Sequence, residues 1–256
     1  MIMKMGSSQQ QLRVQGVIPA RMESRRLPGK AMLPICGRPM IHWVYERSAA
    51  CPLLSDLCVA TDSAIIKQYC LQNDIPVFLT ASTHRSGTER VVELMYKIPA
   101  DIFVNIQGDE PMIQSDHLVS LIEPFQSRAD IAVSTLKTPL EEKDVANPNV
   151  VKVVSNSRGQ ALYFSRAALP YRRNATVFNQ YYKHLGLYAY SRDALERHEA
   201  LAPGPLEQIE QLEQLRFLEY GMPVYVAETP YDTTGVDTEE DLLTVSKYFE
   251  RLQGGA

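Results

Sequence analysis

Short apolar runs alternate with amphipathic stretches through the first half of the chain. Apolar runs of about four to eight residues bounded by turn residues are typical of buried strands, whereas apolar residues three and four positions apart are typical of helices. The alternation therefore predicts strand–helix–strand units and a parallel sheet. The predicted strands are Val14–Ile18, Asp56–Ala60, Pro76–Leu79, Asp101–Ile106 and Ile131–Leu136.

Helices are predicted between these strands, and several begin at recognisable capping residues. Pro39 suits the first turn of a helix that reaches Ala50, and Asp62 can cap the helix Ser63–Leu71. Ser86 and Glu89 have the spacing of a capping box for a helix that reaches Tyr96. Ser115 begins a further helix that ends near Phe125.

The second half of the chain has a different pattern. It predicts two strands around the turn Ser155–Gln160, an aromatic-rich strand, and a last strand after a helix that ends at Gly221. A final helix, which Asp237 can cap, runs to about Arg251. These elements are Val150–Val154, Ala161–Phe164, Tyr181–Tyr190, Pro205–Tyr220 and Val224–Ala227. No linker separates the halves, so we expect a disordered tail over residues 1–11 and one domain with a mixed sheet over residues 12–256.

The composition favours a cytoplasmic, soluble protein. The chain has 256 residues, of which 45% are hydrophobic and 22% charged, with a net charge of −4, and this slightly acidic balance argues against a nucleic-acid partner. No run of about 18 apolar residues is present, and the first residues lack the apolar region of a signal peptide, so no membrane partner is expected. The four cysteines form no CxxC pair, which favours reduced thiols over a disulfide or zinc site.

A dense cationic loop follows the first predicted strand. The segment VIPARMESRRLPGK, residues 17–30, places Arg21, Arg25, Arg26 and Lys30 within ten positions. Arginine offers a planar fork of donors that matches phosphate oxygens, and lysine offers a compact charge. A loop at the carboxyl end of a strand is also where open α/β sheets bind ligands. The loop therefore indicates a polyphosphate site, although a solvated basic loop that pairs with surface acids explains the same residues.

Two carboxylates are candidates for metal binding. Asp109 lies in QGDEP, which follows the strand Asp101–Ile106, and Asp237 lies in TTGVDTEED. Mg²⁺ takes one or two protein carboxylates together with phosphate oxygens and water, so the pair could share one ion. The alternatives are that Asp109 and Glu110 are ordinary turn residues and that Asp237 only caps the last helix.

Two further segments carry polar groups suited to a ligand. Ser86, Gly87, Thr88 and Arg90 of HRSGTER could contact a base carbonyl, or they form a helix cap followed by a surface arginine. In YYKHLGLYAY, His184 and Tyr188 share one face of the predicted strand, and Glu210, Glu213 and Gln214 lie close together on the predicted helix. Such a mixture suits a polyhydroxylated substrate, although such residues are most often simply packed and half-buried. No nucleophile elbow, Ser-His-Asp signature or HExxH motif supports hydrolysis.

Together these segments resemble the 3-deoxy-manno-octulosonate cytidylyltransferases, also called CMP-Kdo synthetases. The segments that match are ARMESRRLPGK, ATD, HRSGTER, NIQGDEP, ALYFSRAALP, KHLGLYAY, LEQLR and GVDTEEDL, in order from about Val14 to Leu243. The resemblance implies a Rossmann-like nucleotidyltransferase fold, with a mixed, mostly parallel central sheet flanked by helices. It also implies a Mg²⁺-dependent homodimer that joins CTP to 3-deoxy-D-manno-octulosonate (Kdo), giving CMP-Kdo and pyrophosphate for lipopolysaccharide biosynthesis.

The resemblance also implies roles for individual residues. Arg21 and Lys30 match the loop that grips the CTP phosphates, with support from Ser24 and Arg26. The cytosine side is matched by Ser86, Gly87 and Arg90, and the Mg²⁺ ligands by Asp109 and Asp237. The catalytic set is then Arg21, Lys30, Asp109 and Asp237. The positions around the sugar acid are Gln107, His184, Tyr188, Glu213 and Gln214.

Two positions depart from the pattern of this family, and both lie in the sugar half of the chain. Gln208 stands where relatives often carry histidine, and Tyr171 where they often carry tryptophan. The sugar therefore stays open between Kdo and a related acid, such as 8-amino-Kdo or a sialic-acid-like sugar. A second class, a non-catalytic nucleotide-binding paralogue, is expected to lack a metal carboxylate, whereas both candidates are present here.

Overall fold

The computed structural model describes residues 12–24, 26–174 and 180–254. The predicted tail over residues 1–11 lies outside this range, as does Arg25 of the basic loop. Among the described helices, none is long and apolar enough to cross a membrane.

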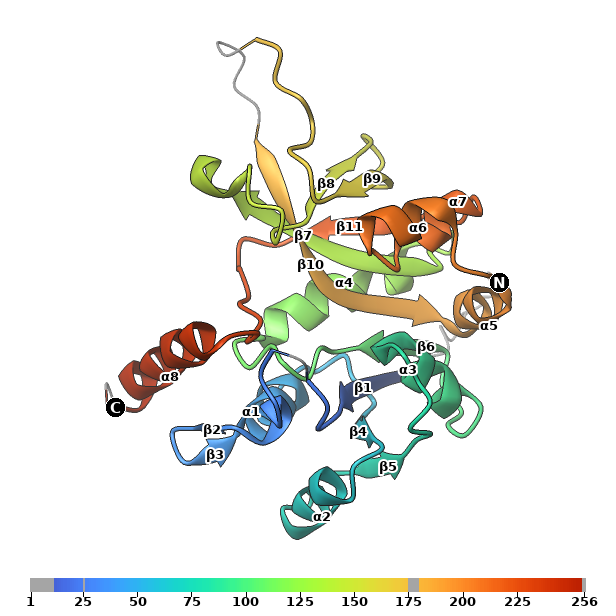
Figure 1. Cartoon of the computed structure of the whole chain (residues 1–256). Coiled ribbons are helices and arrows are strands. Elements are labelled where there is room, and N and C mark those ends of the chain that lie inside the picture. Colours follow the sequence, from blue (N-terminus) through green and yellow to red (C-terminus); the bar gives the residue numbers. More distant parts are fainter. Residues whose placement is uncertain (1–11, 25, 175–179, 255–256) are drawn as a thin grey trace, which may run out of the picture.

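A mixed sheet of 9 strands forms the centre of the molecule (Figure 1), and its main path has the order β11-β7-β10-β6-β1-β4-β5. Strands β6, β1, β4 and β5 run parallel, whereas β10 runs antiparallel to both β6 and β7. The bounds are β1 Val14–Ala20, β4 Asp56–Thr61, β5 Val77–Leu79, β6 Ile102–Asn105, β7 Val133–Leu140, β10 Tyr181–Ser191 and β11 Tyr225–Glu228. With helices on both faces, this sheet confirms the predicted fold class.

Two hairpins extend this frame. Strands β8 (Lys152–Ser155) and β9 (Ala161–Ser165) pair antiparallel, as the sequence predicted, and β8 joins β10 where Lys152 pairs with Lys183. This hairpin lies at the top of Figure 1, beside the end of β10. The second hairpin is formed by β2 (Pro34–Ile35) and β3 (Arg38–Pro39), directly after the short 3-10 helix η1 (Lys30–Met32).

Helices cover both faces of the sheet because its strands are apolar on both sides. In β1, Val14 and Ile18 belong to one core, while Val17 belongs to the opposite core. The first core is completed by α1 (Met40–Ala49), α2 (Ala64–Gln72) and α4 (Ser115–Ser127). The second is completed by α3 (Gly87–Met95), α5 (Arg192–Ala200) and α7 (Leu215–Glu219).

The last helix, α8 (Glu239–Gly254), lies to one side of the sheet at the lower left of Figure 1. It packs on α1 and on the β2–β3 hairpin through a small core that includes Trp43, Val245 and Phe249. The rings of Trp43 and Phe249 have centroids 4.4 Å apart, and the indole N–H of Trp43 donates to the Ile35 carbonyl. Because Asp237 lies two residues before α8, this core determines where Asp237 is held.

The cysteines are all free thiols. Cys51, Cys58 and Cys70 are buried, and burial raises the pKa of the Cys58 thiol to about 12 and that of Cys70 to about 11. These thiols therefore act as small apolar side chains in the core.

Two predicted caps are wrong. Ser63, not Asp62, caps α2, because its hydroxyl accepts from the Ile66 amide, while Asp62 binds an arginine instead. At α8, Thr238 and Asp241 form the reciprocal cap, since each backbone amide donates to the other side chain. The carboxylate of Asp237 is thereby free for other contacts.

The predicted capping box at α3 is only half formed. The Ser86 hydroxyl accepts from the Glu89 amide, as expected. The Glu89 carboxylate, however, accepts from the amide of Arg85, one residue before the cap.

The single helix predicted over Pro205–Tyr220 is also wrong. The chain forms α6 (Pro205–Glu210) and α7, separated by Gln211, which has a left-handed backbone with φ of 54°. Apolar residues recur here at every third position. On an α-helix of 3.6 residues per turn, each of them is rotated about the helix axis by roughly 60° from the one before, so they do not share one face. One helix could not bury them all, so the break turns Leu212 and Leu215 into the core and leaves Ile209 exposed.

The pattern did not predict α5, although its start carries a recognisable signal. Ser191 caps this helix by accepting from the Ala194 amide, and Asp193 lies in the first turn. The helix begins directly after β10, and the aromatic-rich pattern of that strand does not indicate where the strand ends and the helix begins.

The packing of α8 can be tested through Trp43, the one tryptophan of the chain. Phe249→Ala removes a ring that is 1% exposed, and we expect a loss of about 3–5 kcal/mol in the free energy of unfolding. Urea denaturation should show a lower midpoint, and Trp43 emission should shift to the red as its environment becomes wetter. Leu252→Ala, on the exposed side of α8, is the matched control and should change stability by less than about 0.5 kcal/mol. An unchanged midpoint and emission in Phe249→Ala would contradict this account.

Candidate active site

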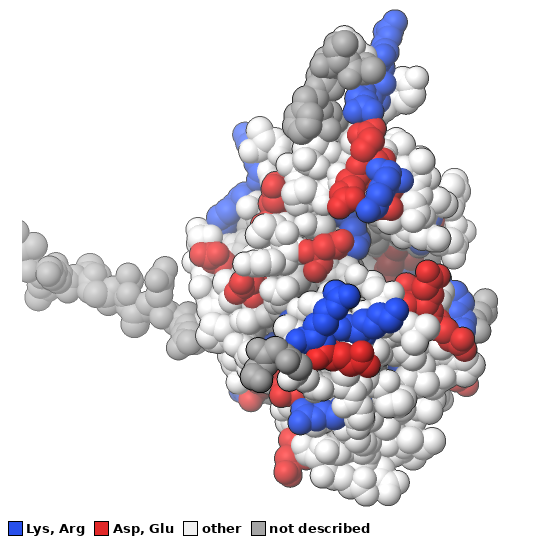
Figure 2. Space-filling model, turned by 90° about the vertical axis from the view of Figure 1, so that its left-hand side faces the viewer, with Lys and Arg blue, Asp and Glu red and all other residues white. Residues whose placement is uncertain are grey.

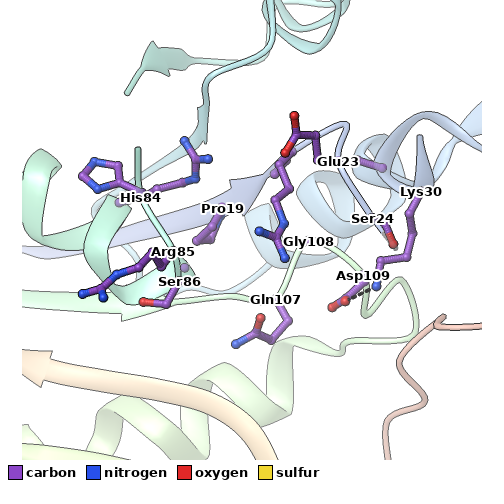
Figure 3. Close-up of a pocket in the computed structure, with 15 residues that line it drawn as sticks. Pro19, Glu23, Ser24, Lys30, His84, Arg85, Ser86, Gln107, Gly108 and Asp109 are labelled. Carbon is purple, nitrogen blue, oxygen red and sulfur yellow. Dashed lines mark hydrogen bonds and ion pairs between the residues drawn. The ribbon is translucent and has the colours of Figure 1, made fainter. Parts of the chain in front are cut away.

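A cavity of about 180 Å³ opens where strands β1 and β6 end. Figure 3 shows Pro19 of β1, Ser24 and Lys30 from the segment after β1, Ser86 from the start of α3, and Gln107 and Asp109 from the loop after β6. The carboxyl ends of neighbouring parallel strands meet at this edge, which is where ligands bind in open α/β sheets. We call this space the first cavity.

The basic loop contributes to this cavity in two different ways. Arg21 and Ser24 line it, and Arg21 has no hydrogen-bond or ion-pair partner among the described residues. Arg26 instead lies outside the lining and forms an ion pair with Asp237 at 2.7 Å. Arg21 is therefore available to an anionic ligand, whereas Arg26 is already paired with a carboxylate.

Lys30 joins the two carboxylates that the sequence singled out. Its ammonium lies 2.5 Å from Asp109 Oδ2 and 3.0 Å from Asp237 Oδ1. Burial alone would lower the pKa of Lys30, but the charges and hydrogen bonds of the two aspartates outweigh burial and raise the pKa. The structure thus brings together one lysine and two aspartates that are remote in sequence.

The two carboxylates suit a magnesium ion that is shared with a phosphate ligand. No group of three or more His, Cys, Asp or Glu side chains that could hold a metal occurs within the described ranges. Magnesium does not need such a cage, because it keeps several waters and uses one or two carboxylates with substrate phosphates. The donor set of Asp109 and Asp237 therefore fits Mg²⁺ only in the presence of a phosphorylated substrate.

Arg90 makes buried hydrogen bonds that the sequence did not predict. Its side chain is 4% exposed, and its guanidinium donates to Asp62 at 2.8 Å and to the Thr80 hydroxyl at 2.6 Å. It still borders the first cavity from within α3. In this arrangement Arg90 holds the segment that leads into α3, while Ser86 and Gly87 form the cavity edge.

Two glycines allow the loops of the first cavity to approach β1. A Cβ atom on Gly108 would lie 2.5 Å from the carbonyl oxygen of Pro19, and one on Gly87 would lie 3.2 Å from the Pro19 ring. The loop after β6 and the start of α3 can therefore close on the end of β1 only without a side chain at these positions.

A larger cavity of about 510 Å³ adjoins the first, and Gln107 borders both. We call it the second cavity. The Gln107 amide donates to the Gly186 carbonyl at 2.9 Å, which holds this side chain at the boundary. The predicted sugar-side residues His184, Tyr188, Glu213 and Gln214 all line the second cavity, and so does Asp237.

His184 is a neutral polar group in the wall of the second cavity. Its Nε2 lies 2.8 Å from the Tyr188 hydroxyl and 3.0 Å from the Thr135 hydroxyl. Burial, together with the charge of Lys183, lowers the pKa of His184 to about 3. The imidazole therefore carries no charge near neutral pH, and it can bind hydroxyl groups as a donor or an acceptor.

Two amide groups in this wall lack partners. Within the described part of the chain, neither Gln214 Nε2 nor Asn105 Oδ1 has a hydrogen bond, although both atoms are buried. Gln214, in the link between α6 and α7, lines the second cavity, and so does Asn105 at the end of β6. Because unpaired buried polar groups are costly, both atoms indicate a polar ligand.

Glu110 is a site residue that sequence reasoning treated only as part of a turn. It lies half-buried in the wall of the second cavity and accepts from the Thr233 hydroxyl at 3.0 Å. Burial and then the neighbouring charge of Asp109 raise the pKa of Glu110 to about 7. Its position beside Asp109 was visible in the sequence, but its inward orientation depends on the fold around Thr233 and Gly235.

Charged groups of both signs gather on this side of the molecule. Figure 2 faces the side that carries α8, and lysine and arginine side chains lie there beside aspartate and glutamate side chains, next to a hollow.

Comparisons with known proteins identify close relatives. A family model described as cytidylyltransferase matches residues 15–227. A 3-deoxy-manno-octulosonate cytidylyltransferase of Acidobacterium capsulatum is 49% identical over 236 residues, which cover 92% of this chain and 96% of the relative. One of the same name from Escherichia coli is 43% identical over 222 residues, covering 87% of this chain and 90% of the relative.

A solved structure agrees with these relatives. The structure of CMP:2-keto-3-deoxy-manno-octonic acid synthetase complexed with CTP has a TM-score of 0.90 and 41% sequence identity to this chain. The match covers 93% of this chain and 99% of that one.

The neutral state of His184 makes a prediction about pH. Between about pH 6.5 and 3 the unfolded chain binds a proton at this histidine and the folded chain does not, so stability falls as the pH falls. Each pH unit in this window costs up to about 1.4 kcal/mol. We expect the free energy of unfolding to fall between pH 7 and 4.5 by roughly 2 kcal/mol more in the wild type than in His184→Gln.

Urea titrations at each pH give this difference, and NMR of the histidine rings provides a direct check. The His184 ring should show no titration above pH 4.5. Equal pH slopes in the two proteins, or a His184 midpoint near 6.5, would show that the imidazole is not held neutral.

Proposed function

The chain belongs to the 3-deoxy-manno-octulosonate cytidylyltransferase family, and on that premise we propose that it joins CTP to Kdo, giving CMP-Kdo and pyrophosphate. The motif resemblance in the sequence is confirmed by relatives that are 42–49% identical over most of the chain. One observation carries the proposal for this site. Asp109 borders the first cavity, Asp237 borders the second, and Lys30 contacts both carboxylates at the junction.

We assign the nucleotide to the first cavity. Arg21 and Lys30 supply cations there, and Ser24 lies beside them in the same lining. Ser86 and Gly87 at the start of α3 present backbone amides and a hydroxyl to the base. The positive end of the helix dipole and these unsatisfied amides favour an acceptor such as a carbonyl oxygen.

The sugar acid is assigned to the second cavity. Its wall combines a neutral imidazole, the Tyr188 hydroxyl, the Glu213 carboxyl and two unpartnered amide atoms. Burial raises the pKa of Glu213, so this carboxyl is easier to protonate than an exposed one. Such a wall suits a ligand with many hydroxyl groups.

The reaction we propose is an in-line displacement at the α-phosphorus of CTP. The anomeric hydroxyl oxygen of Kdo forms a bond to this phosphorus, the bond to the bridging oxygen of the β-phosphate breaks, and pyrophosphate leaves while the hydroxyl proton is lost. Reactions of this kind depend on positioning and charge neutralisation. Arg21 and Lys30 bind the departing pyrophosphate, and the wall of the second cavity orients the hydroxyl.

We propose that Asp109 and Asp237 hold Mg²⁺ when the nucleotide is present. The ion, when bound, supplies positive charge to the phosphates and lowers the pKa of the attacking hydroxyl. Lys30 then contacts phosphate oxygens rather than the two carboxylates, because an ammonium and a divalent cation would repel each other between them.

The family resemblance supports three further proposals. The chain acts as a homodimer, works in the cytoplasm, and serves lipopolysaccharide biosynthesis. Sedimentation equilibrium tests the first of these, since a dimer has twice the chain mass of 28.9 kDa.

Release of pyrophosphate from a panel of nucleotides and sugar acids tests the function. We expect CTP with Kdo to give the highest kcat/KM, and ATP, GTP and UTP to give little turnover. The sugar panel contains Kdo, 8-amino-Kdo and a sialic acid. A preference for either of the last two would replace Kdo as the substrate, and a lack of turnover with all pairs would contradict the proposed reaction.

Removal of either carboxylate should abolish turnover and leave the fold intact. Asp109→Asn and Asp237→Asn should each lower kcat/KM by about 10³-fold or more, because several kcal/mol of charge stabilisation depends on the ion they hold. Circular dichroism should stay unchanged. Asp56→Asn, which removes an exposed carboxylate paired with Arg13, is the control and should keep full activity. Near-normal activity of either site variant with Mg²⁺ would exclude the shared-metal site.

A further inference from the structure

A fully buried lysine lies behind the wall of the second cavity. Lys152, the first residue of β8, is 0% exposed. Its ammonium donates to the carbonyl oxygens of Asn147 at 2.9 Å, Val150 at 2.6 Å and Arg166 at 2.5 Å. An ammonium has three donors, so each one has an acceptor and none is left for a ligand.

The three acceptors are neutral, and no carboxylate contacts the ammonium among the described residues. Burying a charge without a paired counter-ion is costly, and here the three carbonyl dipoles offset that cost. Removing the ammonium would take this donor away from all three carbonyls. What the lysine provides is a fixed distance between two backbone segments, the turn with Asn147 and Val150 and the segment directly after β9 at Arg166.

Two of the three carbonyls fix one wall of the second cavity. Asn149, Val150 and Val151 line this cavity, and the Asn147 and Val150 carbonyls accept from the Lys152 ammonium. The next carbonyl, that of Val151, accepts from the backbone amide of His184 at 2.8 Å. The wall is therefore held on one side by Lys152 and on the other by the strand that carries His184.

The third carbonyl belongs to Arg166, which is connected by hydrogen bonds to the opposite wall of the second cavity. Arg166 uses its backbone amide and its Nε to bind the carboxylate and carbonyl of Glu210, at 3.0 and 2.9 Å. The Ser165 hydroxyl donates to the same carboxylate at 2.6 Å. Glu210 ends α6, and the chain then turns at Gln211 into the segment with Glu213 and Gln214, which line the second cavity.

We propose that Lys152 is a positioning residue that sets the separation of the two walls of the second cavity, acting through Val150 on one side and through Arg166 and Glu210 on the other. This inference rests on the proposed function, because it assigns the sugar acid to that cavity. A shift of about 1 Å in the wall would misplace the attacking hydroxyl and can cost roughly 10²-fold in rate. The first cavity makes no contact with Lys152, so CTP binding does not depend on it.

Kinetics of Lys152→Met tests the proposal, because methionine is also unbranched and only slightly shorter than lysine, and it lacks the three donors. We expect the KM for Kdo to rise by about 10-fold or more, kcat to fall, and the KM for CTP to stay within about twofold. A residue with only a structural role would lower the thermal midpoint without separating the two KM values. Lys143→Met, which changes an exposed lysine paired with Glu141, is the matched control and should alter neither KM.

Glu210→Gln provides an independent test should Lys152→Met not fold. The amide has one oxygen in place of two, so either Ser165 or Arg166 loses its acceptor. We expect the same selective rise in the KM for Kdo. A wild-type KM for Kdo in every variant that folds would overturn the proposal.

The wild-type protein in the same assay separates this proposal from the proposed function. If the wild type does not use Kdo, the proposed substrate is wrong, and the comparison is made with the sugar acid that it accepts. If the wild type uses Kdo and the variants show no selective defect, the proposed function stands and the role of Lys152 is wrong.

Discussion

The arrangement of the site depends on one ammonium group that contacts two carboxylates. Lys30 comes from the segment after β1, Asp109 from the loop after β6, and Asp237 from the segment before α8, and Lys30 and Asp237 are 207 positions apart. Two carboxylates this close repel each other unless a cation lies between them. The three segments meet at the Lys30 ammonium, whose positive charge offsets this repulsion.

The two cavities differ in the charges of the residues that line them. The first combines Arg21, which has no partner among the described residues, with Lys30, and is suited to a strongly anionic ligand. The second places the neutral imidazole of His184, whose pKa burial lowers to about 3, and Glu110, whose pKa burial raises to about 7, beside charged residues of both signs. The neutral imidazole can bind hydroxyl groups as a donor or an acceptor.

Sequence reasoning predicted what depends on local pattern. Apart from β2 and β3, the strands lie where the sequence predicted them, as do the loops after β1 and β6, and His184, Tyr188, Glu213 and Gln214 line one cavity. The errors arose where a distant contact competes with a local one. Asp62 binds Arg90, and Asp237 binds Lys30 and Arg26, so neither caps a helix.

Other features had no local signal at all. The break at Gln211 follows from the need to bury Leu212 and Leu215 against the sheet, and the inward orientation of Glu110 follows from Thr233, 123 positions away. The role of Lys152 likewise depends on three carbonyls that only the folded hairpin brings together. Side chains alone therefore identify the chemistry of such a site, whereas its dimensions come from backbone contacts that the sequence does not display.

The place of β10 in the sheet has a consequence for synthesis on the ribosome. This strand lies between β6 and β7, yet β6 ends at Asn105 and β10 at Ser191. At about 5–20 residues per second, the edge of β6 waits on the order of ten seconds for its partner. During that interval the nascent chain presents an unpaired apolar edge, the kind of surface that seeds aggregation. The parallel half can form early, but it stays open to wrong partners until β10 closes it.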